Sequence, residues 1–236
     1  MFLLLLIGLA VAYIIYKKFP NAEEPVPTVL TVKNIFSNSF SIANNNITII
    51  LGASIFWALT IWIPYINVGT TIGMWALVVG LSKKDTTFSA TSIFNPKYRK
   101  HMGEFFLLLG FITLGMSMGY MFFIIPGLVI SFAWSQAIYL LIDKNLTPLQ
   151  AIKESNNITY GEKMTIFLGY ISIMLVCGIV IGLTNMLLMG LIYSSGAIAL
   201  VFLVGAVNIC LSIITFSIMV ASSIYIYGEL SDKSND

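Results

Sequence analysis

The feature that most constrains this chain is a series of long apolar runs that contain no Asp, Glu, Lys or Arg. The runs cover 1–16, 47–64, 66–81, 105–125, 127–142, 164–188 and 197–227. Crossing the hydrocarbon core of a membrane takes about 20 apolar residues in a helix. Charged residues make up only 9% of the chain, against about 25% in a typical soluble domain. The runs predict a multi-pass helical membrane protein and exclude a soluble enzyme, a disordered chain and a nucleic-acid-binding domain.

Six of these runs pair into three helical hairpins, because the break within each pair is short and uncharged. The breaks lie at 64–67, 125–127 and 189–196, and all 12 basic residues lie outside the runs. Proline and glycine at such breaks end or bend helices. By the positive-inside rule, the basic connections are predicted to be cytoplasmic, which places the N-terminus outside and the C-terminus inside.

The predicted fold is therefore an all-α polytopic transmembrane bundle of about seven spans. It consists of an N-terminal transmembrane helix at 1–19, a Pro-rich cytoplasmic linker with an amphipathic segment at 20–46, a six-span hairpin bundle at 47–228 and a cytoplasmic tail at 229–236.

Each hairpin carries one Gly-xxx-Gly motif. The three motifs are Gly69/Gly73, Gly115/Gly119 and Gly178/Gly182. Glycines at i and i+4 let two helix backbones approach closely in a membrane. These motifs predict packing within the chain, with a dimer contact as the alternative. A looser pair in the first helix, Gly8 and Ala12, predicts a contact between that helix and a partner membrane protein.

The last run carries a polar stripe that has two interpretations. Asn208, Ser212, Thr215 and Ser222 share one helix face, and Gln136 and Asn185 on other spans are candidate hydrogen-bond partners. The stripe makes hydrogen bonds between helices, or it lines a polar groove for a lipid head group. The absence of charged residues from the runs argues against a proton-driven transporter.

Other chemistry is sparse. Lys97, Arg99 and Lys100 lie within the amphipathic stretch of Phe94, Tyr98 and Met102 and are candidates for contact with anionic lipid. The alternative is a solvated connector. The chain has a single histidine, His101, and no cluster with metal-ligand spacing. We therefore predict no catalytic residue, no metal and no cofactor.

One segment resembles a known family. It lies between 125 and 171 and begins with Pro126 and Gly127, followed by an apolar span that leads to Asp143. Ala151, Ser155 and Gly161 then precede a new apolar span. This order resembles a largely uncharacterised family of bacterial multi-pass membrane proteins, related to the membrane domain that precedes some glycerophosphodiester phosphodiesterases. The resemblance implies a bundle in the bacterial plasma membrane and transfers no substrate. The phosphodiesterase barrel is missing, and the extra first span departs from the family pattern.

These observations predict a non-enzymatic integral membrane protein that acts as a subunit or scaffold of a membrane assembly. Its expected partners are membrane lipids and, through the first helix, a partner membrane protein; nucleic acid is not expected. The alternative is a transporter or binder of lipid or a small amphiphile that uses the polar groove on the last helix.

Overall fold

The computed structural model describes residues 29–195 and 199–233, and within this part of the chain all regular structure is helical. The helices are α2 (Val32–Asn45), α3 (Ile47–Thr60), α4 (Pro64–Ser82), the short 3-10 helices η1 (Ala90–Phe94) and η2 (Pro96–His101), α5 (Met102–Phe122), α6 (Ile124–Ala133), α7 (Ala137–Lys144), α8 (Pro148–Ile158), α9 (Lys163–Ser195) and α10 (Ala199–Lys233). The predicted all-α class is confirmed. The predicted span at 1–19 lies outside the described residues.

Five stretches of helix are long and apolar enough to cross a membrane. They are Pro64–Ser82, Pro96–Phe122, Ile124–Lys144, Lys163–Ile192 and Val201–Asp232. This architecture is that of an integral membrane protein. The bent pair α2 and α3 counts as a sixth candidate if the two helices are taken together.

The span predicted at 47–64 differs from the observed structure. The helix in this region, α3, has only 14 residues, which rise about 21 Å at 1.5 Å per residue and fall short of the ~30 Å hydrocarbon core. It ends at Thr60 and cannot continue into α4, because proline disfavours helical backbone in the residue before it and Ile63, which precedes Pro64, is extended. The axis of α3 is also turned by 86° from that of α2.

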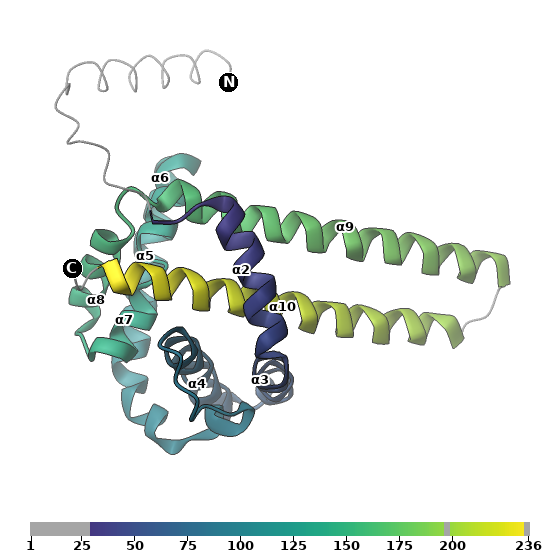
Figure 1. Ribbon diagram of the computed structural model, residues 1–236, viewed down its shortest axis with the longest axis horizontal. Helices are drawn as coiled ribbons and strands as arrows, with labels where there is room; N and C mark the ends of the chain where they lie inside the picture. Colours follow the sequence, from purple (N-terminus) through teal and green to yellow (C-terminus); the bar gives the residue numbers. More distant parts are fainter. Residues whose placement is uncertain (1–28, 196–198, 234–236) are drawn as a thin grey trace, which may run out of the picture.

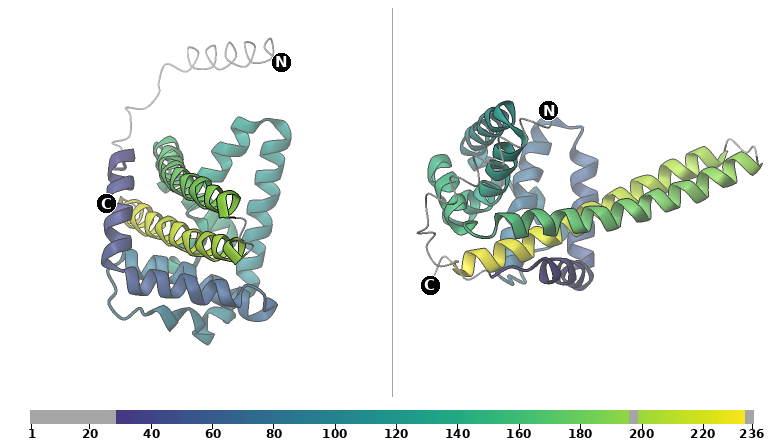
Figure 2. Two further views of the ribbon diagram at one scale, coloured as in Figure 1. Left: turned by 90° about the vertical axis from the view of Figure 1, so that its right-hand side faces the viewer. Right: turned by 90° about the horizontal axis from the view of Figure 1, so that it is seen from above.

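The long hairpin formed by α9 and α10 dominates the shape. Figure 1 shows it as an arm that extends beyond the other helices, with α2 running across it. Seen from above in Figure 2, the outer half of the arm has no other described helix beside it. The hairpins therefore do not stand as one parallel bundle; they cross.

The main hydrophobic core lies where the inner half of α10 meets α2, α3, α4 and α7. Ile35, Leu77, Leu140 and Tyr227 are fully buried there. The ring of Trp57 on α3 stacks on Phe216 of α10, with 4.7 Å between ring centroids. This packing fixes α10 to the body and leaves its outer half free to form the arm.

A buried break divides the span Ile124–Lys144 into α6 and α7. The Ser155 hydroxyl on α8 donates to the carbonyl oxygen of Ala133 at 2.7 Å and accepts the backbone N–H of Gln136 at 3.2 Å. Thr159 also donates to Ala133, at 3.3 Å. Backbone groups released by a helix break must find partners when no water is present. The side chains of α8 supply those partners.

The connector between α4 and α5 folds back along α4, which contradicts one part of the predicted topology. The guanidinium of Arg99 lies over the ring of Tyr65, 5.5 Å from its centroid, and Arg99 also packs on Gly69. We predicted the break at 64–67 outside and Arg99 inside. Because η1 and η2 return to the start of α4, one connector places basic residues at both ends of that helix.

Candidate functional site

A polar pocket opens where α4, α7 and α10 all end. Its volume is about 450 Å³, which is within the range of small-ligand sites. Its charged lining consists of Lys83, Lys84, Asp143, Lys144 and Asp232, and two serines complete it. Cations stabilise helix C-termini, whose carbonyl groups carry partial negative charge. The pocket therefore combines three ammonium groups, two carboxylates and the carbonyl ends of three helices.

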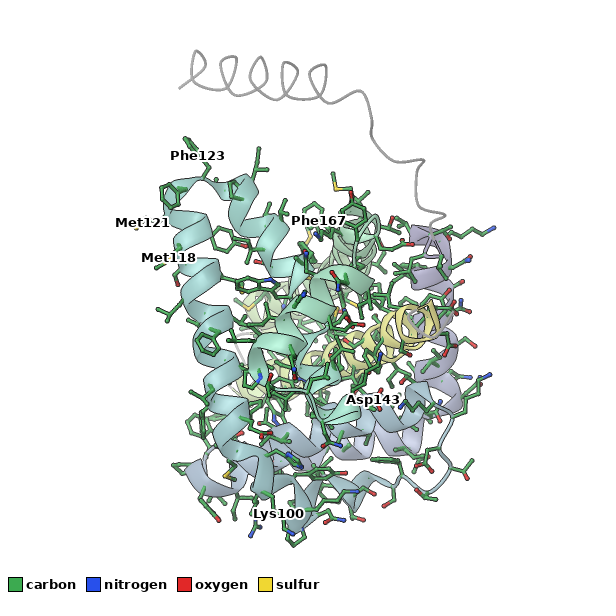
Figure 3. All side chains as sticks on the ribbon, turned by 90° about the vertical axis from the view of Figure 1, so that its left-hand side faces the viewer. Lys100, Met118, Met121, Phe123, Asp143 and Phe167 are labelled. Atoms are coloured by element: carbon green, nitrogen blue, oxygen red, sulfur yellow. The ribbon has the colours of Figure 1, made fainter. Side chains whose placement is uncertain are left out.

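Asp143 is the best-fixed group in this pocket. Its carboxylate is paired with the ammonium of Lys83 and accepts the hydroxyl of Tyr227 at 2.7 Å. Only 7% of the Asp143 side chain is exposed, whereas 54% of Lys83 is. Figure 3 shows Asp143 well away from Lys100 and from the apolar tip at Phe123. Two partners from two other helices hold the carboxylate in place, so Asp143 forms a rigid wall of the pocket.

Lys84 enters the pocket from an unusual backbone conformation. Its φ angle is 57°, in the left-handed region. The N–H of Lys84 donates to Leu81 at 3.1 Å, and the N–H of Asp85 donates to Gly80 at 3.0 Å. This pair of bonds is the Schellman motif, whose left-handed position is usually glycine because a Cβ there is strained. Here the position carries a lysine.

One residue of the predicted polar stripe hydrogen-bonds to a predicted partner, and the other stripe residues lie apart. The side chains of Asn185 and Asn208 exchange two hydrogen bonds, at 2.7 and 3.0 Å, between α9 and α10. The buried hydroxyl of Ser222 donates to the carbonyl of Ile218 on its own helix. The stripe residues are therefore spread along α10 and do not line one groove.

The remaining stripe residues do not complete a groove. Ser212 is exposed and Thr215 is half-buried. Gln136 belongs to the break between α6 and α7; its side-chain amide donates to Ser135 at 3.0 Å. Its side-chain oxygen is buried and has no hydrogen-bond partner in the part of the chain that the structure describes.

Two of the three Gly-xxx-Gly motifs are filled by the chain itself. A Cβ at Gly73 would lie 2.7 Å from the Cα of Ile93, and one at Gly119 would lie 2.9 Å from the Cα of Gly127. Gly115 faces the ring of Trp134 in the same way. These glycines permit helix contacts that any side chain would prevent.

The third motif is open. A Cβ at Gly178 or at Gly182 would meet no atom of the described chain within 4 Å. Both glycines are exposed, Gly178 at the middle of α9 and Gly182 one turn further along the arm. The Gly-xxx-Gly motif is thus packed against other residues in the first two hairpins, whereas in the α9–α10 hairpin no described residue packs on it.

Each residue of the family-like motif has a structural role. Gly127 packs on Tyr120 and Gly119, next to Pro126 in the first turn of α6. Ala151 and Ser155 are fully buried. Gly161 has a φ angle of 84°, which a side chain would strain. Asp143 forms the wall of the pocket. Folding requirements account for the glycine, alanine and serine positions of the motif, whereas Asp143 also lines the pocket.

The three basic residues predicted to contact anionic lipid lie together on η2. Lys97, Arg99 and Lys100 are all exposed. The ammonium of Lys97 lies 5.1 Å from the centroid of the Tyr98 ring. They are placed for contact with a lipid surface at the start of α4, and this role stays a prediction.

The pocket was missed by the sequence reasoning. Lys83, Lys84 and Lys144 were counted only as charges of connecting loops, and Asp143 only as a motif position. The available signal was that three runs each end in charged residues, at 83–85, 143–144 and 229–233. No sequence pattern shows that these three ends meet.

Comparison with known proteins adds no relative: no protein-family model, no curated protein and no solved structure matches this chain. The resemblance of residues 125–171 to bacterial membrane proteins therefore stays a prediction.

Proposed function

We propose that this chain is a non-enzymatic subunit of a membrane assembly in the bacterial plasma membrane, and that its α9–α10 arm packs on another transmembrane helix. The observation that carries the proposal is the open Gly178/Gly182 motif. At Gly73 and Gly119 the same motif lets neighbouring backbone come so close that an added Cβ would lie less than 3 Å from it. In lipid, close packing at small residues is a main source of helix association.

The surroundings of the motif support a helix as the occupant. The two asparagines of the arm satisfy each other, so the outer faces of α9 and α10 present apolar side chains such as Met186 and Leu187. An apolar surface with a small-residue depression suits a transmembrane helix. Transport of a polar head group along α10 is disfavoured, because Asn208 and Ser222 use their hydrogen-bonding groups within the protein.

The occupant comes either from another protein, from a second copy, or from the chain's own run at 1–16. That run carries the small-residue pair Gly8/Ala12. Each of these would place a transmembrane helix on the same face of α9.

A photo-crosslinking amino acid at Leu175, one turn before Gly178, tests the proposal in intact membranes. We expect a protein adduct, and we expect Gly178→Leu with Gly182→Leu to abolish it. The matched control is Gly110→Leu, at an exposed helical glycine that also has nothing within 4 Å.

The mass of the adduct identifies the occupant. A doubled mass indicates a second copy, another mass indicates a partner, and an internal crosslink lost on deletion of 1–19 indicates the first helix. Adducts to lipid alone, unchanged by the double leucine variant, would show that the arm only faces lipid and would overturn the proposal.

A further inference from the structure

We infer that the pocket between the ends of α4, α7 and α10 binds a zwitterionic head group that carries both a phosphate and a primary ammonium. The inference does not depend on the proposed role of the arm. It rests on which charges in the pocket are already paired, on where they stand, and on the unusual backbone of Lys84.

The inner charges of the pocket neutralise one another. Lys83 and Asp143 form an ion pair, and Tyr227 donates to the same carboxylate. Lys144 lies 4.0 Å from Glu154 on α8. These groups form a polar wall but leave no excess charge for a ligand.

Two opposite charges remain at the mouth of the pocket. Within the described residues, neither the ammonium of Lys84 nor the carboxylate of Asp232 has a hydrogen-bond or ion-pair partner. Both residues are exposed, and they line the same pocket from two different helix ends. An anionic group is attracted to Lys84 and a cationic group to Asp232, so a ligand that carries both charges satisfies the pocket.

The backbone conformation at Lys84 indicates that the ammonium group of this lysine has a role in the pocket. Glycine relieves strain at the left-handed position of a Schellman motif, yet this chain has a lysine with a φ angle of 57° there. The three helix C-termini add partial negative charge near the pocket. That charge disfavours a purely anionic ligand and favours one with an ammonium group beside its phosphate.

The position of the pocket favours a lipid as the source of the head group. It lies at the ends of three of the helices whose apolar stretches were identified as candidate spans. Helix ends of this kind lie at the level of the head groups, where phosphoethanolamine groups are presented by the bilayer. The pocket volume of about 450 Å³ accommodates such a group.

Calorimetric titration of the purified full-length chain tests the inference with two short-chain lipids in detergent, a phosphatidylethanolamine and a phosphatidylglycerol. We expect the phosphatidylethanolamine to bind more tightly. Lys84→Gly and Asp232→Asn should each weaken it by about tenfold, the scale of one lost charge-assisted hydrogen bond. Lys84→Gly relieves strain, so a folding defect would not explain the loss. Lys33→Ala, at an exposed basic residue of α2 that does not line the pocket, is the control.

Three outcomes have definite meanings. Binding of free phosphoethanolamine as tightly as the lipid would support the same head-group chemistry with a soluble source. Equal binding of both lipids, unaffected by Asp232→Asn, would show a simple anion site and overturn the inference. Absence of binding to all three probes would also overturn it.

Discussion

Replacing one filled and one open glycine by alanine gives a direct test of the packing described above. At Gly73, an alanine Cβ would lie 2.7 Å from the Cα of Ile93. The obstacle is backbone, which cannot rotate away as a flexible side chain can. Overpacking of this kind costs typically ~1–3 kcal/mol, and only ~0.5–1 kcal/mol is recovered because alanine is the better helix former. We expect Gly73→Ala to lower the free energy of unfolding by about 1–2 kcal/mol.

At Gly178, the same substitution meets no atom within 4 Å. Only the helix-propensity term remains, so Gly178→Ala should raise the free energy of unfolding by about 0.5–1 kcal/mol. Denaturant unfolding in one detergent, followed by tryptophan fluorescence, compares both variants with the parent chain. Equal effects at the two positions would refute the distinction between a filled and an open motif.

Three further experiments test other contacts. Ser155→Ala should destabilise the chain by about 1–3 kcal/mol, because the buried groups at the helix break lose a donor and an acceptor; thermal unfolding in detergent measures this. Tyr227→Phe should cost about 1–2 kcal/mol by the same assay, since Asp143 is buried and loses a charge-assisted hydrogen bond; an unchanged midpoint would contradict the hydrogen bond. Cysteines at Tyr65 and Arg99 should be joined by a short bifunctional reagent in membranes, and failure to crosslink would restore the topology predicted from sequence.

Much of the fold could be predicted from local patterns. A break does separate two paired helices near Pro126 and Gly127, although it lies at Phe123 and not at 125–127, and α4 does begin at Pro64. Proline and glycine act on their own neighbours, and uncharged runs of helical length have few alternatives to a helix in lipid. The class of the fold follows from such features without reference to any distant residue.

What could not be predicted depends on contacts between distant segments. Arg99 reaches Tyr65 only because η1 packs across α4, and no charge or periodicity marks that path. The meeting of Lys84, Asp143 and Asp232 likewise follows from how three helices cross. The positive-inside rule assigns each connector to one side of the membrane. It therefore fails for a connector that runs along the length of a helix and has basic residues at both ends.

The length of α10 connects the pocket with the arm. The stretch from Asn208 to Asp232 rises about 36 Å at 1.5 Å per residue, slightly more than the ~30 Å hydrocarbon core. When Asp232 and the pocket lie at one head-group layer and α10 crosses the membrane, the hydrogen-bonded pair of Asn208 and Asn185 lies near the opposite layer. An amide pair is less costly there than at the bilayer centre, where unsatisfied polar groups find no water. With that placement, depth alone accounts for the polar pair in the apolar arm, and no groove for a substrate is needed.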